Sequence, residues 1–548
     1  MVDPVAATSP FPIRLALRPE LHMRDDVRAV AIPAVKMTVS DMLQRLGIPG
    51  QPEVSWEQKS GATGRPLKIY ANGHPYQYSD EHLLLIHSYA RGEHPRSFEV
   101  LQQIPDWFSR SPVTEVVQWL TLFCSHTLSL HPKFLFGAEQ ARAYCLALPG
   151  MTAEDCGPVA PVLREILELG ISIGDKTAVA EAFKAHGHNA LELREHLIVN
   201  LNPSRIEVRV ERHYLRSLTV SANERIPELF PFLRDGLFAE TGVPYGRFQI
   251  VVDDDLKPGS FAFGLNHLAS IPIVGLPDDL ILVNDQPARI QSARSPAEPA
   301  ITSAEPALIP STYLPGSWTS RTHKLALEAG GLTTWDAFGH LILSLASDLR
   351  LRGWMLVNQS MTQEMLSQFE LDYPDLVDAY NAHFTTEELT SILRSLAAQQ
   401  TPIRNLRRIL ELLLEHEYFV KAGASLSERI DYLSMGLAHE IAHGHSHGRP
   451  LAVYLLDSEF EAALSTREDS DEHVTETLVS AIRAELTHLP PTVRWPPILT
   501  NDEHRAPLVA VIADELPRMR ILSYSRLPPD LNLQPLARIA LTTREANK

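Results

Sequence analysis

The chain has 548 residues, of which 44% are hydrophobic and 21% charged, a balance that predicts a folded protein of several domains. Its formal net charge of −18 argues against a nucleic-acid partner, because phosphate binding needs a basic face. The sparse, odd set of cysteines, Cys124, Cys145 and Cys156, argues against a disulfide framework and indicates reduced thiols in the cytosol. No run approaches the roughly 20 apolar residues that cross a bilayer, so we expect no secretory signal and no transmembrane segment.

Short strand-like runs alternate with helical periods along the chain. Residues 1–35 are rich in proline and charge and predict a flexible N-terminus. Strands are predicted at 206–210, 248–252 and 280–283, a Pro/Ala-rich linker without periodicity at 286–312, and amphipathic helices at 391–417 and 426–443. The pattern indicates a mixed α/β (α+β) protein built from several small domains.

An internal similarity links two distant segments. Residues 162–183 align without a gap with residues 392–413. Four aligned pairs are identical: Leu163/Leu393, Arg164/Arg394, Ile173/Ile403 and Glu181/Glu411. Each segment predicts a helix, a turn and a second helix, with Asp175 and Asn405 at the N-cap position, where a short polar side chain accepts from free backbone amides.

Two weaker similarities occur in the same order. Residues 42–50 are similar to 237–245, and residues 114–130 are similar to 335–351. Helix–turn–helix units can resemble one another by chance, but the shared order favours a degenerate duplication. One half would cover about 36–190 and the other about 205–545.

The second half resembles the cytoplasmic region of the FHIPEP family, the FlhA and SctV type of export gate in flagellar and type III secretion systems. Three blocks carry the resemblance: 232–266, which opens with a helix ending in Glu-Thr-Gly-Val; 361–413, which contains YPDLV and PIRNLRRILE; and 516–539, which contains Leu-Ser-Tyr and a Pro-rich turn. Unlike the family, the sequence predicts no counterpart of the membrane domain. It also has Arg526 after Leu-Ser-Tyr and a partly linker-like segment at 270–334.

The resemblance implies a protein that docks and assembles, not an enzyme. Its implied partners are export substrates, their chaperones or other secretion-apparatus subunits, bound in apolar clefts between small domains. In the family, chaperones dock near the small subdomain that occupies the position of 270–334. The resemblance also implies a cytoplasmic homo-oligomer, peripheral to the inner membrane where it docks on a membrane complex.

The resemblance and the composition together divide the chain into six parts. These are a flexible N-terminus (1–35), a partial N-terminal copy of the family module (36–195), an α/β subdomain (200–285), a linker (286–312), a helical subdomain (313–420) and a C-terminal α/β subdomain (421–545).

A competing hypothesis comes from His439-Glu440-Ile441-Ala442-His443, which matches H-E-x-x-H. On a helix, His439 and His443 share one face and can bind zinc, and Glu440 can act as general base on zinc-bound water. Glu468 is the best third ligand, with Asp471 or Glu472 behind it. This alternative predicts a zinc metallopeptidase.

Three observations favour the docking protein. The motif lies in a histidine-rich stretch, with His445 and His447 close by, where a chance match is easy. It also falls inside the family-like part of the chain, where His439 and Glu440 would be ordinary residues near the C-terminus of a helix. A predicted strand at 451–456 follows at once, where zinc peptidases of this type usually have a turn and another helix. We therefore expect no cofactor and no catalytic residue.

Overall fold

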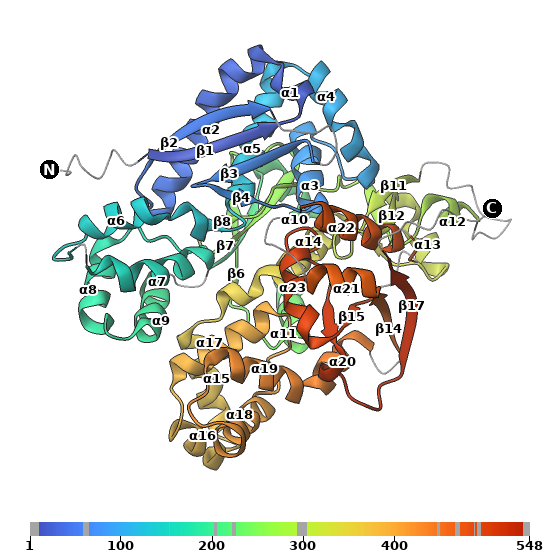
Figure 1. The fold of residues 1–548 in the computed structure, drawn as a ribbon. Helices are drawn as coiled ribbons and strands as arrows, with labels where there is room; N and C mark the ends of the chain where they lie inside the picture. Colours follow the sequence, from blue (N-terminus) through green and yellow to red (C-terminus); the bar gives the residue numbers. More distant parts are fainter. Residues whose placement is uncertain are drawn as a thin grey trace.

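The structure is a computed structural model that describes residues 10–58, 65–152, 154–201, 205–221, 226–292, 304–446, 450–465, 472–486, 488–489 and 495–540. They form three parts, which we call the N-terminal module (10–201), the central module (205–446) and the C-terminal subdomain (450–540). The blue sheet of the N-terminal module and the orange helices of the central module lie at opposite ends of the molecule, with the red C-terminal subdomain between them (Figure 1). None of the described helices is both long and apolar enough to cross a membrane.

The N-terminal module is a four-stranded sheet of order β2-β1-β3-β4 that continues into a group of helices. Its strands are β1 (Pro10–Leu17), β2 (Gln51–Gln58), β3 (Leu67–Ala71) and β4 (His74–Tyr76). Its helices are α1 (Pro19–His22), α2 (Asp25–Leu46), α3 (Asp80–Arg91), η1 (Phe98–Gln103), α4 (Ile104–Arg110), α5 (Val113–Leu128), η2 (Pro132–Leu135), α6 (Ala138–Leu146), α7 (Cys156–Glu168), α8 (Lys176–His186) and α9 (Ala190–Leu201). Strand β1 is parallel to β2 and antiparallel to β3, and α2 makes the crossover between the two parallel strands.

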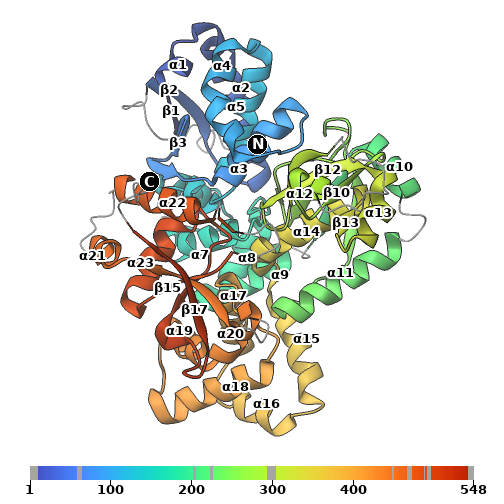
Figure 2. The same ribbon diagram turned by 90° about the vertical axis from the view of Figure 1, so that its right-hand side faces the viewer.

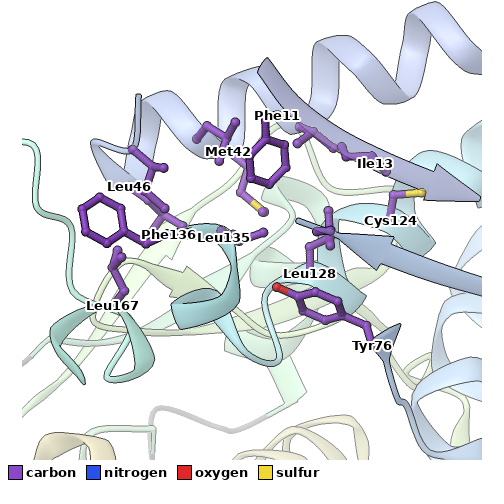
Figure 3. Packing of buried hydrophobic residues seen from close by; sticks show 14 of the residues in the cluster. Phe11, Ile13, Met42, Leu46, Tyr76, Cys124, Leu128, Leu135, Phe136 and Leu167 are labelled. Atoms are coloured by element: carbon purple, nitrogen blue, oxygen red, sulfur yellow. The ribbon is translucent and has the colours of Figure 1, made fainter. Parts of the chain in front are cut away.

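One hydrophobic core runs through this module from the sheet to the helices. Figure 3 shows Phe11 and Ile13 of β1 beside Met42 of α2, with Leu167 of α7 at the other end of the cluster. Cys124 lies within the same core and Cys145 is also buried. Burial raises the pKa of the Cys124 thiol well above its usual range, so this cysteine is a packing residue.

The predicted flexible N-terminus is wrong for residues 10–35; residues 1–9 lie outside the described residues. Strand β1 and the first half of α2 fold within that segment, and α2 runs through the predicted boundary at 35/36. The prediction of a flexible segment rested on its prolines, which fit a strand here. Antiparallel pairing of β1 with β3 begins only at Ile13, so Pro10 and Pro12 lie where no amide is needed on that side. The alternation of buried Phe11, Ile13 and Leu15 with outward residues marks the strand.

The central module repeats this arrangement and adds a second sheet, which we call the inserted sheet. Its strands are β5 (Ile206–Val210), β6 (Phe248–Val252), β7 (Ser260–Leu265), β8 (Leu268–Ala269) and β9 (Ile273–Val274), followed by the inserted sheet of β10 (Leu280–Val283), β11 (Glu305–Leu308), β12 (Pro315–Ser320) and β13 (Thr334–Trp335). Its helices are α10 (Arg212–Ser221), α11 (Ile226–Thr241), α12 (Pro287–Ser292), η3 (Arg321–His323), α13 (Lys324–Ala329), α14 (Ala337–Arg352), η4 (Gly353–Leu356), α15 (Gln359–Glu370), α16 (Pro374–Asn381), α17 (Thr386–Ala398), α18 (Leu406–Glu415), the π-helical turn η5 (His416–Val420), α19 (Leu426–Gly436) and α20 (Ala438–Ser446). The predicted strands at 206–210, 248–252 and 280–283 are confirmed.

The predicted linker at 286–312 is folded at both of its ends. Helix α12 forms near its start, and β11 pairs with β12 near its end. The buried Ala307 faces Gly316 in that pairing, and its small side chain fits the tight contact between strands. Residues 293–303, the middle of the predicted linker, lie outside the described residues.

The predicted helix at 426–443 is broken into α19 and α20. Gly436 packs so closely on Leu412 that a β-carbon there would collide with it, and α19 ends at this contact. Ile430 and Leu433 of α19 lie in the core of the central module. The helical subdomain therefore includes α19 and does not end at residue 420.

The C-terminal subdomain is a four-stranded sheet of order β16-β15-β14-β17 flanked by helices. Its elements are β14 (Leu451–Leu456), α21 (Ser458–Ser465), α22 (Glu472–Leu486), β15 (Ile498–Thr500), α23 (Asp502–Ile512), β16 (Ile521–Ser523), η6 (Tyr524–Arg526) and β17 (Leu533–Ile539). Strand β14 is parallel to both neighbours, β15 and β17, and the predicted strand at 451–456 is confirmed.

The predicted duplication is present in the strand topology. The order β2-β1-β3-β4 of the first sheet recurs as β6-β5-β7-β8 in the second. In both sheets the first strand is parallel to the second and antiparallel to the third. The same order and relative directions of four strands are expected of two copies of one unit and not of chance helix pairs.

Matched hydrogen bonds confirm the alignment residue by residue. The amide of Ile173 donates to the carbonyl of Leu46 at 2.9 Å, and the amide of the identical Ile403 donates to Thr241 at 2.9 Å. Both contacts follow a helix that ends on a glycine with φ +77°, Gly47 in one copy and Gly242 in the other. The glycines bring each helix end against the same turn of the following helix pair.

Two side chains repeat their roles as well. Arg164 donates from Nε to the carbonyl of Phe136 at 2.9 Å, and the identical Arg394 donates to Val357 at 2.8 Å. The N-cap predictions are confirmed, since Asp175 accepts from the amide three residues on at 3.0 Å and Asn405 does so at 3.2 Å. The N-terminal module is therefore a degenerate copy of the central module without the inserted sheet. The predicted halves, 36–190 and 205–545, are wrong in their bounds, because the first copy begins with β1 and the second does not include the C-terminal subdomain.

Candidate docking interface

The two modules are joined at their helical ends by a buried contact, which we call the helical joint. Arg394 of α17 donates to both carboxylate oxygens of Glu195 on α9, at 2.8 and 2.7 Å. The Glu195 side chain is fully buried and that of Arg394 is 8% exposed. The hairpin turn of the central module docks beside this pair, because Asn266 donates to the carbonyl of Leu169 at 2.7 Å. Leu268 from that hairpin and Met355 belong to the core of the N-terminal module, so the central module contributes apolar side chains to that core here.

A different contact joins the N-terminal module to the C-terminal subdomain, and we call it the charged seam. It starts at α3, whose N-cap Ser79 accepts from the amide of His82 at 3.0 Å. Asp80 in the first turn of α3 lies 2.8 Å from Arg483 of α22. Glu81 lies 2.9 Å from Arg518, which follows α23. Carboxylates are favoured in the first turn of a helix, so α3 presents them where its own dipole supports them.

Charge balance in the seam sets the pKa of its groups. Burial raises the pKa of Glu81, and the opposing effect of Arg518 only partly offsets it. Burial lowers the pKa of Arg518, but Glu81 and the ring of Tyr313 outweigh this and the pKa is raised overall. The Arg518 guanidinium lies 4.8 Å from the centroid of the Tyr313 ring. A second ion pair, between Arg65 and Glu515, lies beside the first. Both pairs join the N-terminal module to the C-terminal subdomain.

His131 extends the seam toward the helices. Its Nδ1 lies 2.9 Å from Glu168 of α7, and its Nε2 lies 3.0 Å from Asp514 of the C-terminal subdomain. Burial lowers the pKa of His131, but the hydrogen bonds to Asp514 and Glu168 outweigh it and raise the pKa to about 9. Lys133 lies 3.1 Å from Glu168 as well. At neutral pH the imidazolium therefore links one carboxylate from each side.

The seam borders a cavity of about 560 Å³ between the three parts of the molecule. Its wall includes Glu81, His131 and Arg518 from the seam, and Phe263 and Met355 from the central module. A polar, cavity-lined contact is typical of a separable interface, whereas a dry contact with continuous cores is typical of a permanent one. The two contacts of the N-terminal module therefore differ in kind.

The residues of the zinc hypothesis lie elsewhere, in α20. His439 is exposed, and Glu440 is half-buried with its carboxylate accepting from Asn405 Nδ2 at 2.8 Å. The placement of His439 and Glu440 near a helix C-terminus is wrong, because α20 begins at Ala438 and both residues lie in its first turn. The hydrogen bond from Asn405, the N-cap of α18, ties Glu440 to the helical part of the central module.

The remaining members of that hypothesis lie beyond the structure's description. The side chain of His443 and residues Glu468 and Asp471 are outside the described residues, as is His447. Among the side chains that the structure does describe, no group of three or more His, Cys, Asp or Glu is placed to hold a metal ion. The zinc ligand set therefore remains a hypothesis.

Sequence reasoning did not identify either interface. Arg394 was singled out only as a duplicated residue, although a buried Glu195 between Leu193 and Leu197 on one helix signals a charge that needs a partner. The Ser79-Asp80-Glu81 sequence signals a helix start. Its partners Arg483 and Arg518 lie some 400 residues away, and no local pattern predicts such a pairing.

Comparison with known proteins decides the family. The FHIPEP family model matches residues 125–532, which is most of the chain. The chain belongs to the FHIPEP family. Among curated FHIPEP-like relatives, it is 24% identical over 321 residues to the low calcium response locus protein D of Yersinia pestis, covering 56% of this chain and 44% of that protein. It is 25% identical over 322 residues to the hypersensitivity response secretion protein HrcV of Ralstonia nicotianae, covering 56% of this chain and 44% of that protein.

A solved FHIPEP-type fold is also similar. The structure of the Chlamydia pneumoniae CdsV protein matches with a TM-score of 0.51 at 22% identity, covering 61% of this chain and 98% of that one. The chain spans less than half the length of the curated relatives it matches. Helix α3 and the first sheet lie outside residues 125–532, whereas the inserted sheet and almost all of the C-terminal subdomain lie inside.

Proposed function

We propose that this protein is a docking and assembly component of a type III secretion apparatus. The observation that carries the proposal is that the matched part of the chain has the fold of a secretion-protein body, with CdsV as the similar solved example. CdsV has also been solved in a complex with CdsO, which supports protein partners for this fold. The described interfaces are built from packed helices and ion pairs between small domains, as a docking protein needs.

We further propose that the protein acts in the cytoplasm, on a membrane-embedded partner, as a homo-oligomer. Export substrates, their chaperones or other secretion-apparatus subunits are the partner classes. The acidic net charge of −18 supports protein partners over nucleic acid.

A secretion assay in the organism that encodes the chain tests the proposal. Deleting the reading frame should remove type III substrates from the culture supernatant, and the wild-type gene supplied in trans should restore them. Mass photometry of the purified chain over a range of concentrations should show species larger than one 61.1 kDa chain. Unchanged secretion in the deletion strain would contradict the proposed role.

No observation favours the zinc peptidase as a second function. Its general base, Glu440, is held by Asn405, and its His439 is exposed to solvent. We therefore propose that the protein works without a catalytic residue and without a cofactor, and the zinc content of the purified chain tests this.

A further inference from the structure

Helix α3 lies between two parts of the chain that belong to the matched family region. In Figure 2 it sits above the space between the yellow-green inserted sheet and the red C-terminal subdomain. On one side, Leu84 packs with Leu308, the last residue of β11 in the inserted sheet, and with Tyr313, which lies between β11 and β12. On the other side, Asp80 and Glu81 pair with the C-terminal subdomain. We call the surface that receives α3 the α3 groove.

The groove and the helix have complementary chemistry. Arg483 and Arg518 provide positive charge at one end of the groove, and Leu308 and Tyr313 provide an apolar surface beside it. Arg518 joins the two ends, because it donates to the carbonyl of Ser311 at 3.2 Å next to the apolar patch. The groove therefore fits an amphipathic helix that starts with carboxylates and continues with leucines.

Helix α3 presents that pattern on one face while it packs on its own module with the other. Glu81, Leu84 and Leu85 are spaced i, i+3 and i+4, which places them on one side of a helix. Leu83 and Ile86 point the other way, into the core of the N-terminal module. The recognition face thus has the sequence Asp-Glu-x-x-Leu-Leu.

The groove belongs to the family body, and its occupant does not. Helix α3 lies outside the residues that the FHIPEP model matches, 125–532, whereas Leu308, Tyr313, Arg483 and Arg518 lie inside them. The charged seam, in which α3 lies, contains several ion pairs and borders a cavity, as is typical of an interface that can separate. The helical joint holds the same module through a buried ion pair.

We propose that the α3 groove is a docking site for a partner protein's helix with an acidic first turn followed by two leucines, and that α3 is the chain's own occupant of it. The proposal rests on the proposed docking function and names the partner chemistry. Because α3 is tethered, its local concentration is high, and an outside helix binds only when the seam opens. The N-terminal module then acts as a built-in competitor that pivots on the helical joint.

Peptide uptake by the full chain tests the proposal. The probe is a fluorescent peptide of residues 77–94, read by fluorescence anisotropy. In the variant Asp80→Lys/Glu81→Lys, α3 is repelled by Arg483 and Arg518 while the groove is unchanged. We expect this variant to bind the peptide at least ten-fold more tightly than the wild-type chain does.

Three controls make the result specific. Arg91→Glu at the far end of α3, where Arg91 pairs only with the nearby Glu93 among the described residues, should bind like wild type. The groove variant Arg483→Glu/Arg518→Glu should reject the natural peptide and bind a peptide with lysine at positions 80 and 81. Asp80→Asn removes only the carboxylate that pairs with Arg483, and this variant replaces the double variant in the binding assay if the double variant does not fold.

The outcomes separate this proposal from the proposed function. A released variant with native circular dichroism that takes up no peptide would overturn the docking groove, as would equal binding of the natural and charge-swapped peptides. Normal secretion in the deletion strain would instead overturn the function on which the groove depends.

Discussion

The helical joint and the charged seam hold the N-terminal module to two different parts of the chain, the central module and the C-terminal subdomain, in different physical settings. At the helical joint, Glu195 and Arg394 are buried, and Leu268 and Met355 of the central module pack into the N-terminal core. At the charged seam there are four cross-module ion pairs, and two of them, Glu81–Arg518 and His131–Asp514, line a cavity. The carboxylates of α3 face arginines from a distant part of the sequence. A duplicated module can therefore be fixed at one end and released at the other.

The comparison also shows what duplication changed. Arg164 and Arg394 keep the same bond from Nε to a backbone carbonyl. Only Arg394 gains a buried carboxylate, Glu195, among the described residues. The second copy has thus converted an internal structural residue into the link between modules, while the charged seam uses residues without counterparts in the duplication.

The largest expected effect is at the helical joint. Arg394→Met removes two hydrogen bonds from the buried Glu195 and leaves Arg194 as its ionic partner, so the free energy of unfolding should fall by about 2–4 kcal/mol in urea denaturation. Adding Glu195→Leu should recover most of that loss. The matched control is Arg164→Met, which removes the duplicated backbone bond alone and should cost about 1 kcal/mol. Equal losses for the two arginine variants would show that the buried pair is not what joins the modules.

The next largest effect tests the duplicated glycines. Gly242→Ala places a β-carbon against the backbone of Arg404 at φ +77°, and should cost about 2–3 kcal/mol by thermal denaturation. Gly73→Ala is the control, because Gly73 has φ +81° but open space around it, and should cost only about 1 kcal/mol. If both variants lose the same stability, the loss comes from the positive φ alone, and the close contact of Gly242 with the backbone of Arg404 is not its cause.

The seam should respond to pH through His131. Its folded pKa of about 9 lies above the ordinary 6.5, so its stabilisation is complete below about pH 6.5 and is lost as pH rises through 9. The groups that face it are Glu168, Asp514 and Lys133. Wild type should exceed His131→Gln by on the order of 1–3 kcal/mol at pH 6 and by little at pH 10. A difference that grows with pH would contradict this assignment.

The smallest effect is expected at the histidine-rich helix. His439→Ala should change the free energy of unfolding by less than about 1 kcal/mol, because His439 is exposed at the start of α20. Chain purified without a histidine tag should hold well under one zinc per chain by elemental analysis. Stoichiometric zinc lost in His439→Ala, together with peptide cleavage lost there and in Glu440→Gln, would instead establish the peptidase.

Local signals predicted more of the fold than of the interfaces. Asp175 and Asn405 were predictable as N-caps because capping depends on residues within one helical turn. Strand β1 was missed because the prolines at 10 and 12 suggested disorder. Antiparallel pairing with β3 begins only at Ile13, so neither proline has to donate an amide hydrogen bond to β3. The division of 426–443 into two helices depends on the contact of Gly436 with Leu412, which is a tertiary constraint. The pairing of α3 with Arg483 and Arg518 joins opposite ends of the chain, beyond any periodicity.

The most direct test of the two-contact account is a pair of distances measured in the full chain. Spin labels at Arg91 and Glu503 would report across the charged seam, and labels at Asn200 and Glu364 would report across the helical joint, all four positions being exposed. The double electron–electron resonance experiment compares low salt with 1 M salt, which screens ion pairs. We predict that the seam distance lengthens and broadens in high salt while the joint distance is unchanged; two distances that both stay fixed, or both lengthen together, would contradict the account.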